Sequence, residues 1–349
     1  MNGKLMKIFN NWQIIAKGWY LVCPSQEILV NQVKSFDLCG QRIAIFRRVD
    51  GQLSALSAYC PHLGTDLGLG WVEGDWVRCR FHHWAFDGKG ECRQIPCQTV
   101  IPPQAKLSAY ATAEAYDFIW IYPDAVAPFG VPEFDELKGK QVVTQADRPL
   151  YRPCHHHICM MNGIDVQHLS TVHGLDIAMD LEVKPDPSGQ CLDFTLTGIV
   201  PETTWQERFL KSFLGPTYSY SMRYAQGCIG LLTLCKNVRL LPPLYMFYAY
   251  LPEPHYTSAG LDVTQSRVKV WPIYVTEKRS GFLGKLISWI LLLLTRLAYY
   301  RLRGEDGEIY ENIQFRANLL LPIDAPLKTY MDYVNQLEPS VWSYSEKVH

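Results

Sequence analysis

Short runs of apolar and β-branched residues, separated by polar and turn-forming residues, occupy positions 10–125 of the chain. They include IIAKGWYLVC, RIAIFRRV, WVRCRF and DFIWIYP, and Gly, Asp and Pro interrupt them. Short strands bounded in this way are typical of a small all-β domain. The Pro-bearing stretch YPDAVAPFGVPEFDELKGK follows these runs, and its composition predicts a linker.

The second half of the chain combines strand-like and helix-like patterns. The runs CLDFTLTGIV, TYSYSMRYA, LLTLCKNVRL, LYMFYAYLP and RVKVWPIYVT predict an antiparallel sheet. Apolar residues at helical spacing predict helices around 162–173, 281–300 and 306–320. We therefore expect an α+β second half, without internal repeats.

The most apolar segment is GFLGKLISWILLLLTRLAYY at 281–300. Only ten uncharged residues separate Lys285 from Arg296, whereas a spanning helix requires about 20. We therefore do not expect it to cross a bilayer. Two interpretations stay open. The segment is a core or subunit-interface helix, or it lies on a membrane or gates an apolar substrate channel, with Lys285, Arg296 and Arg301 at its polar edge.

Composition and charge exclude several classes of protein. The 349 residues include 33 basic and 34 acidic ones, so the chain as a whole has no attraction for nucleic acid or an anionic surface. A hydrophobic share of 48% is enough to bury a core. The N-terminal residues lack the continuous apolar run of a secretory signal. Eleven cysteines in a chain of this size predict reduced thiols, and hence a cytoplasmic protein, with membrane association through 281–300 as an option.

The segment CPHLGTDLGLGWVEGDWVRCRFHHW contains two short Cys/His pairs. Cys60 and His62 are separated by one residue, sixteen residues follow, and then come Cys79 and His82. A Cys2His2 zinc site is one interpretation, but zinc pairs usually have two to four intervening residues. Two loops that each supply one thiolate and one imidazole suit a two-iron cluster better, with both thiolates on one iron and both imidazoles on the other.

A second constellation is NGIDVQHLSTVHG, in which Asp165, His168 and His173 follow one another. Asp165 and His168 would share one helix face. The two histidines would lie about 140° apart on a regular helix. For both to reach one ion, the helix must end or bulge near residues 170–172. Asp165 would then support a ligand histidine rather than bind the metal itself.

The first motif, with Pro61 and Gly64 in place, resembles the Rieske [2Fe–2S] family. The resemblance implies that Cys60 and Cys79 hold the inner iron, and that His62 and His82 hold the outer one. Rieske proteins of respiratory complexes have two further cysteines where this chain has Thr65 and Phe81, so the cluster resembles the oxygenase type. Trp84 also fits, whereas His83 stands where the family commonly has Gly.

The second motif, preceded by Asn162, resembles the mononuclear iron site of Rieske non-heme iron oxygenases. The family completes its two-histidine, one-carboxylate site from far downstream. The matching segment GEDGEIYENIQF, which we expect to begin a helix, selects Asp306 as the third ligand beside His168 and His173, with Glu311 as the follower. Glu305 and Glu308 are competing neighbours, and an acidic helix N-terminus is the alternative explanation. We expect His155, His156 and His157 to be packing or surface residues, with His156 or His157 as candidates for the active-site wall.

The resemblance covers nearly the whole chain. It implies a Rieske domain over 1–130 and a catalytic domain over 131–349 with a helix-grip (START-like) fold, an antiparallel sheet around a substrate cavity. It also implies a homotrimer, because electrons in the family cross between subunits. Asp165 would bridge His82 of one subunit to His168 of its neighbour.

The implied activity is O2-dependent oxidation, most simply hydroxylation, of a small hydrophobic substrate at Fe(II). Electrons would come from NAD(P)H through a separate ferredoxin or ferredoxin reductase, because the chain has no flavin- or nicotinamide-binding glycine loop. Demethylation and desaturation are alternatives within the family. A Rieske electron carrier and a zinc-bearing lipid-binding module are alternatives of other classes. Aromatic-rich strands favour a polycyclic or terpenoid-like substrate, although core packing explains the same residues.

Overall fold

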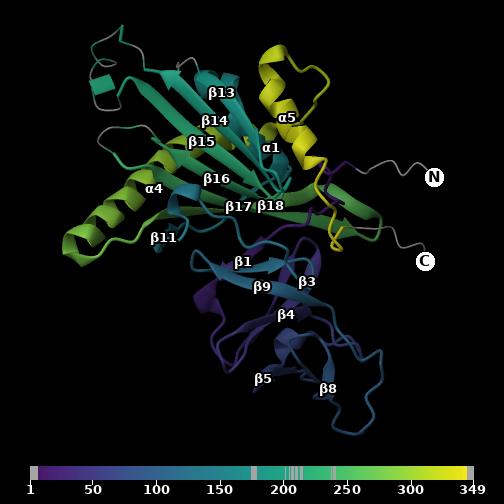
Figure 1. Cartoon of the computed structure of the whole chain (residues 1–349). Helices are drawn as coiled ribbons and strands as arrows, with labels where there is room; N and C mark the ends of the chain where they lie inside the picture. Colours follow the sequence, from purple (N-terminus) through teal and green to yellow (C-terminus); the bar gives the residue numbers. More distant parts are fainter. Residues whose placement is uncertain are drawn as a thin grey trace.

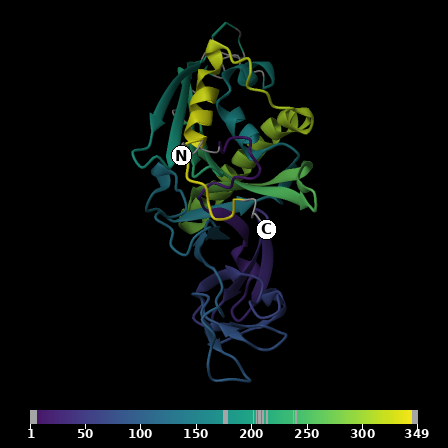
Figure 2. The ribbon, with the colours of Figure 1, turned by 90° about the vertical axis from the view of Figure 1, so that its right-hand side faces the viewer.

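The computed structural model describes residues 7–173 and 179–343, except for 201, 204, 206–207, 209–210, 213–214, 237 and 239–240. Two lobes are stacked along the long axis of the molecule, with the strands of the first third of the chain at one end (Figures 1 and 2). The lobes differ in architecture. The first consists of two sheets, and the second is one large sheet with helices.

The first lobe is entirely antiparallel. A six-stranded sheet in the order β1-β10-β9-β4-β3-β2 adjoins the second lobe, and a four-stranded sheet in the order β5-β6-β7-β8 lies at the far end. The strands are β1 Tyr20–Pro24, β2 Val33–Leu38, β3 Gln41–Arg47, β4 Leu53–Ser57, β5 Trp71–Glu73, β6 Trp76–Arg78, β7 Ala85–Phe86, β8 Cys92–Gln94, β9 Ala109–Ala115 and β10 Phe118–Tyr122.

The second lobe is built on one antiparallel sheet in the order β11-β18-β17-β16-β15-β14-β13, with β12 also paired to β18. Its strands are β11 Val142–Ala146, β12 Leu150–Arg152, β13 Met179–Pro185, β14 Cys191–Ile199, β15 Thr217–Ala225, β16 Ile229–Leu234, β17 Leu244–Thr257 and β18 Gly260–Glu277. The helices are α1 His156–Met161, α2 Val166–Thr171, α4 Gly281–Asn312 and α5 Ala325–Val334. Short 3-10 turns occupy Ser25–Glu27, Leu67–Leu69, Asp135–Leu137, Asn162–Ile164 and Pro322–Asp324.

The first part of β17 and the last part of β18 are buried on both faces. Successive side chains of a strand point to opposite faces, so alternate residues contact different partners. One set faces the first lobe and includes Phe247, Leu251, Trp271 and Ile273. The other set faces the helices and includes Met246, Tyr250, Val270 and Tyr274. The near-continuous hydrophobic runs of these strands follow from this double burial.

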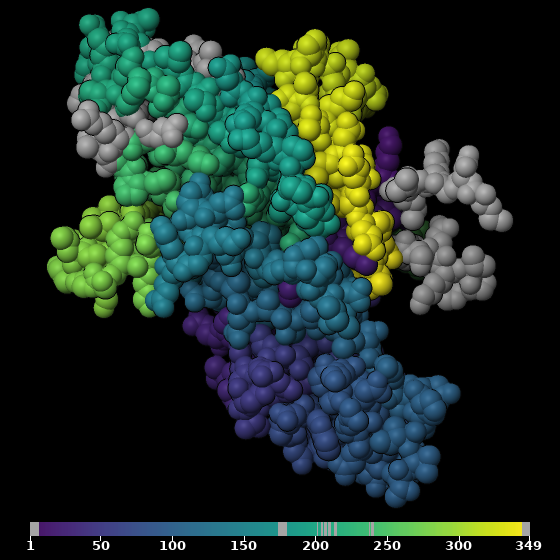
Figure 3. Space-filling model, in the orientation of Figure 1, coloured from purple at the N-terminus to yellow at the C-terminus, as the bar shows by residue number. Residues whose placement is uncertain are grey.

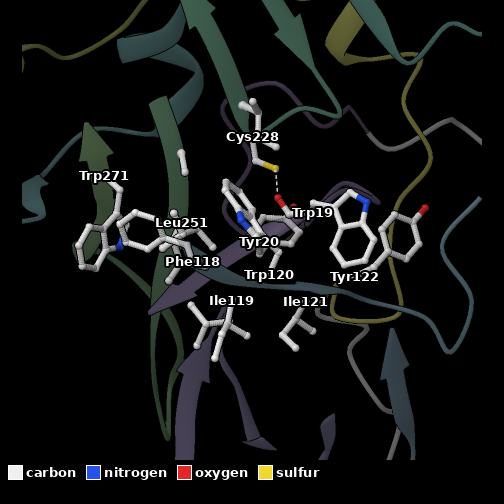
Figure 4. Packing of buried hydrophobic residues seen from close by; sticks show 14 of the residues in the cluster. Trp19, Tyr20, Phe118, Ile119, Trp120, Ile121, Tyr122, Cys228, Leu251 and Trp271 are labelled. Carbon is white, nitrogen blue, oxygen red and sulfur yellow. Dashed lines mark hydrogen bonds between the residues drawn. The ribbon is translucent and has the colours of Figure 1, made fainter. Parts of the chain in front are cut away.

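A shared apolar core, which we call the interlobe core, joins the two lobes. It contains Trp19, Tyr20, Phe118 and Trp120 from the first lobe and Leu251 and Trp271 from the second (Figure 4). Phe247 of the second lobe belongs to the same core. Phe118 meets Trp271 edge to face, and Trp120 meets Phe247 in the same way, each at a ring-centroid distance of 5.3 Å. Such pairs contribute roughly 0.5–1.5 kcal/mol each beyond their buried area.

The structure confirms the predicted α+β class with a small all-β unit followed by a largely antiparallel sheet. The division at 130/131 stays a prediction, and contacts cross it, since Ile8 and Ile14 pack with residues of the second lobe. The separate helix predicted over 306–320 is wrong. Residues up to Asn312 continue α4, and no helix follows until the turn at Pro322–Asp324.

The three consecutive histidines at the start of α1 are packing residues. His155, His156 and His157 are all buried, and none of them lines the cavity described below, so the candidacy of His156 or His157 for the active-site wall is wrong. The His155 Nδ1 atom accepts the His157 backbone N–H as a helix cap. Because Nδ1 accepts this bond, the proton of the neutral ring lies on Nε2. A protonated Nε2 has no lone pair to offer, so it is a poor metal ligand.

Burial of these imidazoles predicts acid sensitivity. Burial lowers the pKa of His156 to about 3, and it lowers the pKa values of His155 and His157 well below their usual value. Below about pH 6.5 the unfolded chain binds protons at these sites that the folded chain refuses, so stability falls as the pH drops. Between about pH 7.5 and 5.5, where the unfolded imidazole takes up its proton, we expect the His156→Gln variant to lose about 1.4 kcal/mol of this dependence in total.

Urea unfolding between about pH 7.5 and 5.5 measures that slope. The exposed His255 provides a matched control, because its replacement by Gln removes an imidazole that is not buried. An identical slope in the His156→Gln variant and in the unaltered protein would contradict the assignment.

Candidate metal centres

Helix α2 and the turn after it position two histidines. The Asp165 side chain caps the helix by accepting the backbone N–H of His168 at 3.1 Å. The helix ends at Thr171, within the interval where convergence of His168 and His173 required an interruption. Because the backbone leaves the helix there, His173 turns back toward His168, and their ring centroids lie 4.7 Å apart.

Helix α4 brings a carboxylate to the same point. The Asp306 Oδ1 atom lies 2.8 Å from His168 Nε2 and 3.3 Å from His173 Nε2. The two Nε2 atoms are 3.0 Å apart. We call His168, His173 and Asp306 the triad. Its side chains expose only 8%, 5% and 18% of their surface, so three donor atoms face one another with little access for water.

The donor set fits a divalent cation. Ligand bonds of about 2.1 Å at right angles place neighbouring donors about 3 Å apart, which matches the spacing in the triad. In addition, Asp306 Oδ1 is buried without a hydrogen bond of suitable geometry, a costly state for a carboxylate oxygen unless a cation binds it. Two imidazoles and one carboxylate, with positions left open, are typical of non-heme Fe(II). The ligand roles stay a prediction.

Two further acidic residues of the predicted segment do not join the triad. Glu308 is exposed, and Glu311 pairs with Arg152 at 3.4 Å. Asp306 lies in the last two turns of α4, so the expectation that it begins a helix, and the alternative of an acidic helix N-terminus, are both wrong.

Two polar residues contact the histidines of the triad. The Glu305 carboxylate accepts a hydrogen bond from His173 Nδ1 at 2.6 Å, and this bond lowers the pKa of Glu305. A carboxylate in this position fixes the ring and directs Nε2 toward the ion. The Asn162 Nδ2 atom lies 3.1 Å from His168 Nε2. The sequence offered Glu305 only as a rival ligand, because its pairing with His173 spans 132 residues.

A cavity of about 330 Å³ adjoins the triad. Several of its tyrosines donate their hydroxyl groups to backbone carbonyls: Tyr220 to Gly163 at 3.2 Å and Tyr224 to Met160 at 2.6 Å. Their rings therefore present mainly apolar surface to the cavity. The aromatic wall consists of Tyr218, Tyr220, Tyr224, Tyr248, Tyr250, Tyr299 and Tyr310.

The four residues of the first motif lie on two loops at the far end of the first lobe. Cys60 and His62 follow β4, and Cys79 and His82 follow β6. Each loop is closed by a short backbone bond, from Gly64 N–H to Cys60 O at 2.9 Å and from His83 N–H to Cys79 O at 3.0 Å. Both cysteines are buried at these turns, whereas the two imidazoles reach the surface.

The burial pattern fits a two-metal cluster. Cys60 and Cys79 are 3% and 2% exposed, whereas His62 is exposed and His82 half-buried. Burial raises the pKa of the Cys60 thiol to about 12, so its thiolate needs a metal ion beside it. The His62 and His82 rings are 4.5 Å apart. Within the described part of the chain, these four side chains do not converge on one point as the triad does, which favours two irons over a single zinc ion.

His83 occupies a strained backbone position. Its φ is 57°, a left-handed conformation that glycine adopts without cost. Its ring packs edge to face against Trp71 at 4.9 Å, so it points toward that indole. A glycine at residue 83 would adopt this backbone conformation without strain.

We expect the His83→Gly variant to be more stable than His83→Ala by about 1 kcal/mol, because both lose the imidazole but only glycine relieves the strain. Thermal unfolding of the two variants compares them. Both should keep full iron and sulfide. Loss of cluster iron from His83→Gly would instead make His83 a ligand.

Comparison with known proteins places these centres in context. The sequence model of the Rieske [2Fe-2S] domain family matches residues 18–110. Cholesterol 7-desaturase nvd from Xenopus laevis is 31% identical over 189 residues, which are 53% of this chain and 40% of that protein. The oxygenase component of 3-ketosteroid-9-alpha-monooxygenase from Rhodococcus rhodochrous is 28% identical over 171 residues, 45% of this chain and 42% of that protein. The chain thus spans about two fifths of the length of these relatives.

Solved structures share the whole fold. NdmB from Pseudomonas putida CBB5 covers 95% of this chain and 92% of its own, with a TM-score of 0.67 and 16% identity. Dicamba monooxygenase bound to 3,6-dichlorosalicylic acid covers 92% of this chain and 97% of its own, with a TM-score of 0.62 and 17% identity. At such identities the likeness supports the fold of both lobes.

Proposed function

We propose that this protein is an O2-dependent oxidoreductase acting on a hydrophobic, steroid-like substrate, because residues 18–110 form a Rieske [2Fe–2S] domain and the whole chain has the fold of Rieske-type oxygenases. The observation that carries the proposal is the triad at the wall of an apolar cavity. A Rieske electron carrier needs neither the triad nor the cavity, so this observation weighs against that alternative.

Two groups complete the proposed enzyme. Cys60, Cys79, His62 and His82 would hold the [2Fe–2S] cluster, and the triad would hold Fe(II). The iron supplies reductive activation of O2 with electrons from the cluster. The residues of this chain do the rest. Glu305 keeps the proton on His173 Nδ1, Asp165 caps α2 so that His168 keeps its position, and the tyrosine wall excludes water from the reacting bond.

The substrate class rests on the cavity and on the relatives. A cavity with walls of tyrosine rings suits a rigid polycyclic hydrocarbon skeleton. The named substrates of the relatives, cholesterol and a 3-ketosteroid, are of that kind. We propose hydroxylation as the reaction. Desaturation is the second candidate, favoured by matches to cholesterol 7-desaturases from several animals.

Electron supply requires other proteins and other subunits. The four cluster residues follow β4 and β6 in the first lobe, and the triad comes from α2, the turn after it and α4 in the second lobe. Figures 1 and 2 show the two lobes stacked along the long axis of the molecule. We therefore propose a homotrimer in which the cluster of one subunit serves the triad of the next. Asp165 would lie on that path. A ferredoxin or ferredoxin reductase would supply the electrons, and the free cysteines are compatible with a cytoplasmic enzyme.

Product analysis tests the proposal. Protein loaded with iron and sulfide is supplied with NADH, a surrogate reductase and O2, and is offered sterols, 3-ketosteroids, simple arenes and small polar acids. We expect turnover of a steroid, with gain of one oxygen atom for hydroxylation or loss of two hydrogen atoms for desaturation. Turnover of small polar acids alone would contradict the substrate class. Reduction of the cluster without O2-dependent product from any compound would favour the electron carrier.

A further inference from the structure

The first turns of α4 carry an exposed apolar stripe. This part of the helix projects beyond the sheet, next to β11 (Figures 1 and 3). At 100° per residue the stripe occupies an arc of about 120°. The exposed fractions reach 87% at Phe282 and 58% at Trp289. We call this stripe the outer face of α4. It consists of Phe282, Leu283, Leu286, Trp289, Ile290 and Leu297.

The opposite side of α4 is attached to the protein. Ser288, Leu292 and Tyr299 are buried there, and Ser288 donates a hydrogen bond to the Glu277 carbonyl at 3.1 Å. Arg296 pairs with Asp147 at 2.7 Å. By length and composition α4 could cross a membrane, and 22% of its most apolar window is buried. Since crossing would detach the buried side, the geometry favours contact through the outer face alone.

The basic residues around the outer face indicate a negatively charged partner. From Lys278 to Arg303 the chain has six basic residues and no acidic one, although its net charge is -1. Lys278 and Lys285 are exposed near the start of the outer face, whereas Arg296 is paired with Asp147 and Arg301 with Glu305. An apolar helical stripe flanked by cations matches the boundary between acyl chains and anionic headgroups. A two-fold contact between the outer faces of two copies of the chain would bring the same like charges together.

We propose that the outer face of α4 docks this protein on the surface of an anionic phospholipid bilayer, with the helix lying in the interface. Later turns of the same helix line the cavity through Ala298, Tyr299 and Leu302 and supply Asp306. Docking would therefore place the cavity beside the lipid that dissolves a steroid, and only this delivery role rests on the proposed function.

Vesicle flotation of the full-length, metal-loaded protein tests the docking itself. We expect binding to phosphatidylcholine vesicles containing phosphatidylglycerol to be at least about ten-fold tighter than binding to phosphatidylcholine alone, and to weaken with salt. Replacing Phe282, Leu286 and Trp289 together by Ser should weaken binding at least about ten-fold. In a matched control, Ser replaces three apolar residues that are exposed in the first lobe and its linker: Leu29, Val100 and Val126. This control variant should bind vesicles as tightly as the unaltered protein does.

Iron and sulfide content establishes that each variant is folded. Turnover separates the two proposals. The outer-face variant should oxidise detergent-dispersed steroid normally and vesicle-borne steroid at least about ten-fold more slowly. Vesicle binding without any turnover would overturn the proposed function but not the docking. Failure to bind vesicles, equal binding by both triple variants, retention through alkaline carbonate extraction, or an oligomer that only the outer-face variant dissociates would overturn the docking.

Discussion

The His168→Ala variant is expected to lose one iron per chain and nearly all oxidation of substrate, while keeping the Rieske EPR signal. Iron should fall from about three to about two per chain, with two sulfides retained. His168 Nε2 lies 3.0 Å from His173 Nε2 and 2.8 Å from Asp306 Oδ1. Without His168 only His173 and Asp306 are left as donors, which is too few to hold the iron tightly. Turnover should fall by at least about 10³-fold, more than the 10–100-fold typical for loss of an outer partner.

The exposed His255 again provides the control. Its replacement by Ala should leave iron, sulfide and turnover unchanged. Metal analysis and the EPR spectrum of the dithionite-reduced protein are measured on the same samples. An unchanged iron content in His168→Ala would remove the triad from the metal site and, with it, the main argument for an oxygenase.

The Cys79→Ser variant is expected to give the complementary result. Cys79 is 2% exposed, and the interior around it cannot stabilise a partly assembled cluster, so both cluster irons and both sulfides should be lost together. Iron should fall to about one per chain, the visible colour should disappear, and turnover should cease because electrons no longer reach the triad.

Cys97 is exposed in the same lobe, which makes Cys97→Ser a matched control that should keep colour and activity. Zinc without sulfide in the unaltered protein would contradict both expectations. The two variants together assign the iron to the two centres. His168→Ala removes the single iron of the triad, and Cys79→Ser removes the two irons of the cluster.

The sequence predicted the elements whose signals are local. The strands around 217–225 and 244–252 are confirmed because alternation and β-branched or aromatic content are properties of short windows. The spacing of His168 and His173 required a helix end near residue 171, and α2 ends there. The four residues of the first motif come from two loops closed by short backbone bonds, which also lie within a few residues.

Features that depend on distant contacts were missed. Gly304 and Gly307 lie where a new helix was expected to begin, but α4 continues through both. Each glycine costs the helix about 1 kcal/mol, and packing of α4 against β17 and β18 offsets that cost. The cavity and the pairing of Glu305 with His173 likewise require residues from separate elements, and no local pattern encodes them.

The interlobe core has a consequence for how this chain can evolve. Trp120 has no exposed surface, and it is covered by Phe247 from a strand more than a hundred residues away. If the first lobe were excised, large aromatic surfaces would be exposed on both fragments. Folding of either lobe is therefore coupled to folding of the other, and the chain should melt in one cooperative transition. The lobe is not an interchangeable cassette, and a graft between relatives must carry the opposing faces of β17 and β18 with it.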